Sequence, residues 1–135
     1  METRILNFNE FGDDRGCLIS LESMKNIPFE IERVYYIYKT KSEVTRGYHA
    51  HRDLKQVAIA LSGSCTFVLD DGLSRNEVIL DDPTKGLLIC SMIWREMKLF
   101  SDDCILLVLA NHNYNEEDYI RDYSSFLKEV RNICN

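Results

Sequence analysis

Hydrophobic residues occur along this chain in short runs, and clusters of glycine, aspartate and serine separate the runs. The runs are rich in β-branched and aromatic side chains, as is typical of β-strands. We expect strands over residues 4–8, 17–21, 31–38, 46–51, 56–61, 65–69, 76–80, 87–90, 93–99 and 104–110. Many short strands punctuated in this way predict an all-β fold of the double-stranded β-helix, or jelly-roll, type.

Turn residues mark where the strands end. The sequence GDDRG at residues 12–16 separates the first two strands. Gly63, which can supply a positive φ, predicts a hairpin between the strands 56–61 and 65–69. Because no repeat, linker or low-complexity tract interrupts the pattern, we expect a single domain over residues 1–135.

The tail of the chain has a different period. Within residues 116–134 the apolar positions recur at helical spacing, and the acidic residues 116–118 would complement the dipole of the first turn. The apolar stripe consists of Tyr119, Tyr123, Phe126, Leu127, Val130 and Ile133. We expect a C-terminal helix that packs this stripe on the outside of the barrel, so we assign its tyrosines to packing.

Composition narrows the class of protein. The chain has 135 residues, a formal net charge of −6 and ordinary apolar content, which indicates a soluble domain without broad affinity for nucleic acid or anionic membranes. No segment is long and apolar enough to span a bilayer, and the N-terminus lacks the core of a signal peptide. Five cysteines without a CxxC pair indicate reduced thiols, so we expect a cytoplasmic protein.

Two of the three histidines, His49 and His51, lie in the strand 46–51. Alternate residues of a strand share a face, so the two side chains point the same way. With Arg46 and Tyr48 beside them they suggest a cluster of acid/base and anion-binding groups. Two surface histidines of a polar strand would have the same spacing. The spacing alone does not distinguish these alternatives, so other parts of the sequence are needed.

The spacing around these histidines resembles the cupin pattern, in which a His-x-His strand is followed by a carboxylate and then a turn glycine. Gly63 is in place, but Gln56 stands where metal-binding cupins need Glu, and Arg95 stands where they place a further histidine. A neutral amide and a permanent cation make a poor site for a divalent metal. We therefore expect neither a metal nor another cofactor, and we interpret the histidines as proton carriers.

Segments that cover nearly the whole chain resemble the sugar-nucleotide 3,4-ketoisomerases. They are RVYYIY (33–38), RGYHAHRDLKQV (46–57), LSGSCTFVLDDG (61–72), WRE (94–96) and YIRDYSSFL (119–127). The resemblance implies a cupin-like, dimeric, metal-free enzyme that converts a dTDP-4-keto-6-deoxyhexose, such as dTDP-4-keto-6-deoxyglucose, to its 3-keto isomer. The product would then be transaminated to an amino sugar, for a glycan such as lipopolysaccharide.

Moving a ketone from C4 to C3 requires removal of the C3 proton, an enediol, and return of a proton to C4. The site needs a base and a donor to the developing oxyanion. We assign His51 as the base that moves the carbon-bound proton, and His49 with one tyrosine as the groups that serve the two oxygens. Adjacent strand residues face opposite ways, so only one of Tyr35 and Tyr36 lines the cavity, and Arg33, on the same face as Tyr35, favours Tyr35.

The diphosphate of a nucleotide sugar calls for planar, bidentate cations. The candidates for substrate binding are Arg46, Arg15, Arg33, Arg95, Trp94 and Tyr36. Arg46 is the first choice for the diphosphate, whereas Trp94 would either stack on the thymine or belong to the core. Arg95 also bears on the face of the enediol that is protonated at C4. One sequence does not fix that face, and of the gluco and galacto products we favour gluco.

Two other functions fit part of the sequence. A dTDP-sugar 3,5-epimerase abstracts protons on either side of the same ketone, but its histidine base pairs with a carboxylate, and no such partner is evident beside His49 or His51. A non-catalytic sugar-nucleotide-binding module would not need two titrating groups. We assign His112 to a solvated loop, and the aspartate pairs at residues 70–71 and 102–103 to turns.

Overall fold

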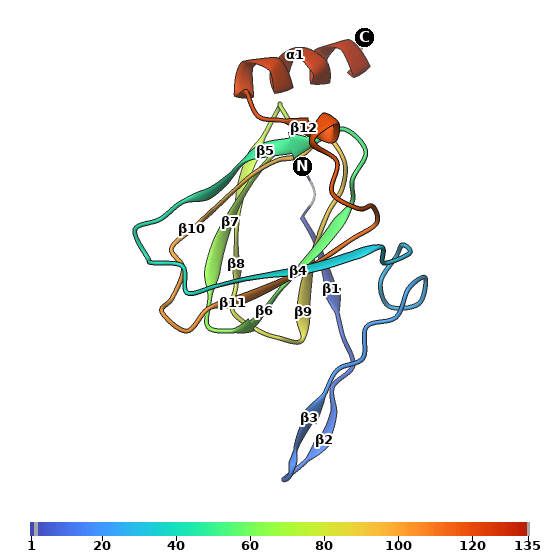
Figure 1. The fold of residues 1–135 in the computed structure, drawn as a ribbon, viewed down its shortest axis with the longest axis vertical. Helices are drawn as coiled ribbons and strands as arrows, with labels where there is room; N and C mark the ends of the chain where they lie inside the picture. Colours follow the sequence, from blue (N-terminus) through green and yellow to red (C-terminus); the bar gives the residue numbers. More distant parts are fainter. Residues whose placement is uncertain (2, 135) are drawn as a thin grey trace.

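The structure is a computed structural model that describes residue 1 and residues 3–134. Two five-stranded sheets pack face to face as a jelly roll (Figure 1), which confirms the predicted fold class. The first sheet has the order β1 (Arg4–Asn7), β9 (Lys85–Ile89), β6 (Gln56–Ser62), β11 (Ile105–Ala110) and β4 (Arg33–Tyr38). The second has the order β12 (Tyr119–Ile120), β5 (Arg46–His51), β10 (Trp94–Lys98), β7 (Cys65–Asp70) and β8 (Arg75–Leu80).

The main core lies between the two sheets, where Ala58 and Ala60 of β6 pack in one cluster with Phe67 of β7. The alternate residues Val57 and Ile59 point the other way, into a second apolar cluster on the outer face of the first sheet. Both faces of β6 are therefore buried, which explains why its hydrophobic run is continuous.

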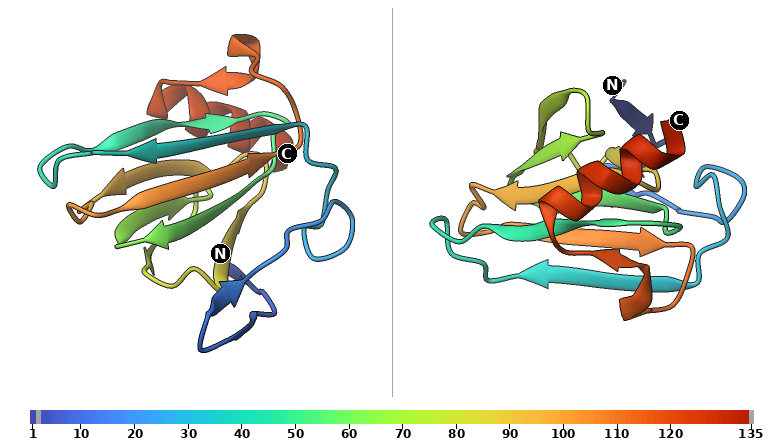
Figure 2. Two further views of the ribbon diagram at one scale, coloured as in Figure 1. Left: turned by 60° about the horizontal axis from the view of Figure 1, so that its bottom comes forward. Right: turned by 90° about the horizontal axis from the view of Figure 1, so that it is seen from above.

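The C-terminal helix α1 (Tyr123–Cys134) lies against the outer face of the second sheet (Figure 2), as predicted. Its Phe126 is fully buried and packs on Trp94 of β10. The predicted helix begins too early, because Glu116–Asp118 form a short 3-10 turn, η1, and the strand β12 follows it. Asp122 accepts a hydrogen bond from a backbone N–H of the first helical turn, and this cap sets where α1 begins.

The predicted hairpin through Gly63 is wrong. β6 pairs with β11 and β9 in the first sheet, whereas β7 pairs with β8 and β10 in the second. Gly63, at φ 65°, turns the chain from one sheet to the other. The local turn signal is correct, but the choice of strand partners is made by the whole fold.

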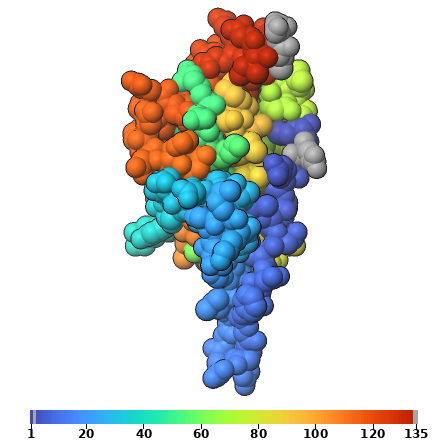
Figure 3. All heavy atoms as spheres, turned by 90° about the vertical axis from the view of Figure 1, so that its right-hand side faces the viewer, coloured from blue at the N-terminus to red at the C-terminus, as the bar shows by residue number. Residues whose placement is uncertain are grey.

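A small hairpin projects from the body of the molecule (Figure 3). It consists of β2 (Phe11–Asp13) and β3 (Gly16–Leu18), which form a separate two-stranded sheet. The strand expected over residues 17–21 is thus displaced and shortened, and β2 has no counterpart among the predicted strands. Phe11 and Leu18 are each 60% exposed, so the hairpin carries apolar surface into solvent.

Within the described part of the chain, no helix is long and apolar enough to cross a membrane. Cys17, Cys65, Cys90 and Cys104 are free thiols, as predicted, and the side chain of Cys134 lies outside the described residues.

Candidate active site

β5 presents both of its histidines to the interior. The ring centroids of His49 and His51 lie 4.9 Å apart in a T-shaped arrangement. His49 is half-buried, and the side chain of His51 is only 1% exposed. The shared face is therefore confirmed, and the alternative of two surface histidines is excluded.

A bulge in β5 brings Arg46 to the same cleft as His49. Strict alternation would place these two residues on opposite faces. However, Gly47 and Tyr48 adopt positive φ values of 92° and 60°, and the pairing of β5 with β10 shifts register at this point. Glycine is needed at the bulge, because a Cβ on Gly47 would lie 2.8 Å from the carbonyl oxygen of Arg95.

His49 lines a cleft of about 580 Å³ that combines residues from several distant segments. The lining residues are Arg33, Tyr35, Ile37, Val44, Thr45, Arg46, Gly47, His49, Met97, Tyr114, Tyr119 and Arg121. Three of them are arginines and none is acidic, so the cleft is suited to an anionic ligand.

β4 turns Tyr35 inward and Tyr36 outward. Tyr35 lines the cleft, and its hydroxyl oxygen accepts a hydrogen bond from Nε2 of Gln56 at 3.1 Å, which leaves the O–H free to donate. Burial raises the pKa of Tyr35, so the phenol stays protonated at neutral pH. Tyr36 is 64% exposed on the other face and lines neither cleft of its own subunit. The prediction that it binds the substrate of that subunit is therefore wrong.

The floor of the cleft holds an amide–guanidinium pair. Arg95 is 2% exposed and donates hydrogen bonds to Oε1 of Gln56 and, at 2.8 Å, to the carbonyl oxygen of Ile93. Because the amide oxygen faces Arg95, the amide nitrogen is turned to Tyr35. Burial lowers the pKa of Arg95 to about 10, which leaves a cation at neutral pH. Such a cation would repel a divalent metal, and the described residues contain no group of three or more His, Cys, Asp or Glu that could hold one.

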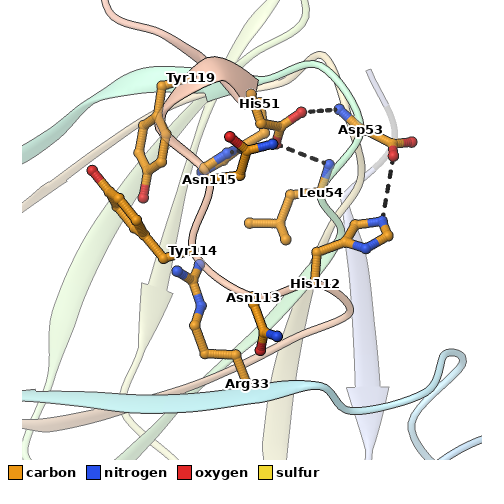
Figure 4. Close-up of a pocket in the computed structure, with 10 residues that line it drawn as sticks. Arg33, His51, Asp53, Leu54, His112, Asn113, Tyr114, Asn115 and Tyr119 are labelled. Carbon is orange, nitrogen blue, oxygen red and sulfur yellow. Dashed lines mark hydrogen bonds and ion pairs between the residues drawn. The ribbon is translucent and has the colours of Figure 1, made fainter.

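His51 opens on a second cleft, of about 450 Å³ (Figure 4). Its Nδ1 lies 3.0 Å from Oδ2 of Asp118. The carboxylate also accepts hydrogen bonds from the backbone N–H groups of Asp53, at 2.8 Å, and of Leu54, at 3.3 Å. At the rim, the exposed His112 contacts Asp53. No carboxylate partner is evident in the sequence beside either histidine, but the structure supplies one to His51 from the C-terminal tail.

Tyr119 lies between the two clefts and lines both. β12 pairs it directly opposite His51, and its ring centroid is 4.3 Å from that of His51 and 5.0 Å from that of His49. The guanidinium of Arg121 stacks 4.2 Å from the Tyr119 ring and donates to both carboxylate oxygens of Glu116. The assignment of Tyr119 to helix packing is wrong, because the residue belongs to the wall of the site.

Both histidines are neutral at pH 7. Burial, followed by the nearby cation of Arg95, lowers the pKa of His49 to about 4 and also lowers the pKa of His51. A neutral imidazole has a free lone pair, so it can accept a proton from a substrate and return it.

Arg33 and Arg46 are the cations of the cleft that form no ion pair with the described part of the chain. Nε of Arg33 is buried and has no hydrogen-bond partner among the described residues. Its guanidinium packs over the rings of Tyr35 and Tyr114, at 5.2 and 5.9 Å from the centroids. Both arginines are therefore available to an anion.

Two predicted binding residues lie elsewhere. Trp94 is 3% exposed and packs against Tyr123 of α1 on the outer face of the second sheet, so the core alternative is the correct one. Arg15, at the tip of the β2–β3 hairpin, pairs with Asp13 at 2.6 Å and lines neither cleft of its own subunit. The predicted residues that the structure does bring together are His49, His51, Tyr35, Arg33, Arg46 and Arg95.

Sequence analysis missed Asp118, Tyr119 and Arg121. All three lie in the part of the tail that helical spacing assigned to the helix. The local signal for a later start of the helix is Asp122, whose side chain accepts the N–H of Ser125 and caps the first turn of α1.

Comparison with known proteins agrees with this geometry. The sequence model of the family described as FdtA, WxcM-like, C-terminal, matches residues 1–131. The TDP-4-oxo-6-deoxy-alpha-D-glucose-3,4-oxoisomerase of Aneurinibacillus thermoaerophilus is 49% identical over 133 residues, which cover 98% of this chain and 96% of that protein.

Two solved structures have nearly the same fold. A 3,4-ketoisomerase from Helicobacter canadensis superposes with a TM-score of 0.94 at 53% identity, over 97% of this chain and 98% of its own. A mutant of the 3,4-ketoisomerase QdtA from Thermoanaerobacterium thermosaccharolyticum, solved with TDP-4-keto-6-deoxyglucose, gives 0.94 at 41% identity, over 96% of this chain and 94% of its own. The resemblance seen in the sequence is confirmed: this chain belongs to the FdtA (WxcM-like, C-terminal) family, whose relatives here are 3,4-ketoisomerases of TDP-sugars.

Proposed function

We propose that this protein is a dTDP-4-keto-6-deoxyglucose 3,4-ketoisomerase that moves the ketone from C4 to C3 without a metal ion. One observation carries the proposal: the cleft joins neutral His49 and protonated Tyr35 to Arg33 and Arg46, two cations without an ion pair among the described residues. These groups supply a proton carrier, a donor to an oxyanion and an anion site. The choice of substrate is supported by relatives that match nearly the full chain and whose names give this activity or this sugar.

The reaction consists of proton transfers alone. A base removes the C3 proton while a donor stabilises the oxyanion at O4. The enediol that results is protonated at C4 as the C3 hydroxyl loses its proton. Each proton removed from one position of the sugar is balanced by a proton added at another. Neutral imidazoles and a protonated phenol can therefore carry out every transfer.

We assign the carbon-bound proton to His49 and the protons on oxygen to His51 and Tyr35. His49 is half-buried and shares the cleft with Arg46 and Tyr35, which supports a direct contact with the sugar. His51 is more deeply buried and packs against Tyr119, which favours its assignment to the protons on oxygen. The sequence alone favours the opposite assignment, in which His51 moves the carbon-bound proton and His49 serves the oxygens.

For binding, we assign the diphosphate to Arg33 and Arg46, because a guanidinium can bind phosphate through two parallel hydrogen bonds. Arg95 lies at the floor with His49 and Tyr35, so we assign it to the C3/C4 edge of the sugar. A cation at that edge is consistent with the gluco product, which we propose here.

The test is to incubate the purified protein in D₂O with dTDP-4-keto-6-deoxyglucose and to follow the sugar by NMR. A 3-keto product with deuterium at C4 is the expected result. Exchange at C3 and C5 without that product would identify a 3,5-epimerase, which the His51–Asp118 contact keeps as a second candidate. Binding without any exchange would identify a non-catalytic sugar-nucleotide-binding module.

We also propose a cytoplasmic homodimer that serves amino-sugar biosynthesis for a glycan such as lipopolysaccharide. The exposed apolar surface on β4 and on the β2–β3 hairpin supports assembly. Tyr36 and Tyr38 project from β4, and Phe11 and Leu18 project from the hairpin. In a dimer, Arg15 on the hairpin would reach only the partner's site. A monomer by light scattering at micromolar concentration would contradict this proposal.

A further inference from the structure

The proposed reaction gives Asp118 no task, yet this residue holds the most constrained carboxylate near the histidines. Its Oδ1 accepts the backbone N–H of Asp53 at 2.8 Å, and its Oδ2 accepts that of Leu54 at 3.3 Å and faces Nδ1 of His51 at 3.0 Å. Its backbone carbonyl accepts the N–H of Arg52 at 3.0 Å. The segment just after β5 therefore fixes Asp118 in place on several sides.

These contacts determine the position of the proton on His51. A backbone N–H can only donate, so both carboxylate oxygens of Asp118 act as acceptors. The hydrogen in the contact with His51 therefore belongs to the imidazole Nδ1. Because the imidazole is neutral at pH 7, its other nitrogen, Nε2, carries a lone pair.

Among the residues that the structure describes, Nε2 of His51 has no partner for that lone pair. It is buried and makes no hydrogen bond within the described part of the chain. A buried acceptor without a partner is unfavourable unless a ligand completes it. The rings of His49 and Tyr119, which line the substrate cleft, pack against the His51 ring, with centroids 4.9 and 4.3 Å from its own.

We propose that Asp118 is a positioning residue, which holds His51 as the Nδ1–H tautomer so that Nε2 accepts a proton from a hydroxyl of the sugar. The inference rests on the proposed function for the identity of the sugar, but the tautomer itself does not depend on it. The sequence gives no sign of this pair, because 67 positions separate its members.

The experiment has two arms that fail independently. In the first, two-bond ¹H–¹⁵N correlation spectra of the imidazole rings are recorded on the labelled protein at pH 7. The three histidines are assigned from single His→Asn variants. The expected spectrum of His51 shows protonated Nδ1 and unprotonated Nε2. The Nε2–H tautomer in the wild-type protein would overturn the proposal, whether or not the protein is an isomerase.

In the second arm, Asp118→Asn is compared with the matched control Glu117→Gln, an exposed neighbour with no hydrogen bond from its carboxylate to the described residues. The side-chain amide that Asp118→Asn introduces would donate to Nδ1 and convert His51 to the Nε2–H tautomer. We expect kcat to fall by about 100-fold or more, KM and TDP affinity to stay within a few-fold, and the spectrum to change accordingly. Glu117→Gln should match the wild type.

A folded Asp118→Asn protein with unchanged kcat and unchanged tautomer would overturn the proposal. If the variant does not fold, the spectrum of the wild-type protein still decides. If the wild-type protein shows no isomerase activity, the proposed function fails while the tautomer remains a separate result.

Discussion

His49 and His51 lie two residues apart on β5 and point the same way, but different parts of the chain surround them. His49 is half-buried and shares an open cleft with Tyr35 and Arg46. His51 is buried, and Asp118 from the C-terminal tail holds its Nδ1. The comparison shows that spacing along a strand sets the direction of a side chain, whereas neighbours far along the chain set its chemical environment.

The difference has a structural origin in the two neighbours of β5. On one side β10 pairs with β5 through a bulge, which places Arg46 beside His49. On the other side the two-residue strand β12 covers His51 with Tyr119 and brings in Asp118. Each histidine thus takes its environment from a different strand.

The largest effect is expected when either imidazole is removed. His49→Asn and His51→Asn should each lower kcat by about 10³-fold, because a positioned acid or base contributes about 10²–10⁴-fold. Only His49→Asn should also abolish exchange of the C3 proton with D₂O, as measured by NMR. TDP affinity, measured by calorimetry, should stay within a few-fold in both. Loss of C3 exchange in His51→Asn alone would reverse the roles.

A smaller loss is expected on the oxyanion side of the His49 cleft. Tyr35→Phe removes the phenol that donates into the cleft, and kcat should fall by about 100-fold, as is typical for one oxyanion donor. The neighbouring Tyr36→Phe is the matched control, because Tyr36 faces outward. Steady-state kinetics of the two variants would contradict the assignment if both lost activity equally.

The charged rim of the same cleft should affect binding more than turnover. Arg46→Ala should weaken TDP binding by about 10-fold, since a charge-assisted hydrogen bond contributes about 1.5–3 kcal/mol. The loss should shrink as salt is added, because screening weakens the wild-type interaction. Arg131→Ala, on the exposed side of α1, should leave the calorimetric Kd unchanged. Equal losses in both variants would point to a general charge effect.

The smallest effect is expected in the pH dependence of kcat/KM. A pKa of about 4 for His49 means that its basic form persists as the pH falls, so kcat/KM of the free enzyme should be flat from pH 8 to about 5. An ordinary histidine would give a decline centred near pH 6.5. Because the pKa of Tyr35 is raised, no basic decline is expected below about pH 10. Circular dichroism at each pH separates titration from unfolding, and a midpoint near 6.5 would contradict the buried, neutral state.

The sequence by itself determined most of what depends on neighbouring residues. The hydrophobic runs placed most of the strands, and the period of two set His49 and His51 on one face and Tyr35 and Tyr36 on opposite faces. Gln56 and Arg95 indicated a neutral amide and a cation in place of metal ligands, because residue type alone fixes their charge. The motifs were sufficient to recognise the family.

Only the tertiary structure decided which strands pair and which distant residues meet. Gly63 marks a turn in either case, but pairing across the sheets makes it a crossing between sheets and not a hairpin. The bulge at Gly47 puts Arg46 beside His49, against strict alternation. Asp118 reaches His51 because pairing with β5 outweighs the helical spacing of the tail. Pairing, bulges and long-range contacts are settled by packing over the whole fold, and residue periodicity carries no record of them.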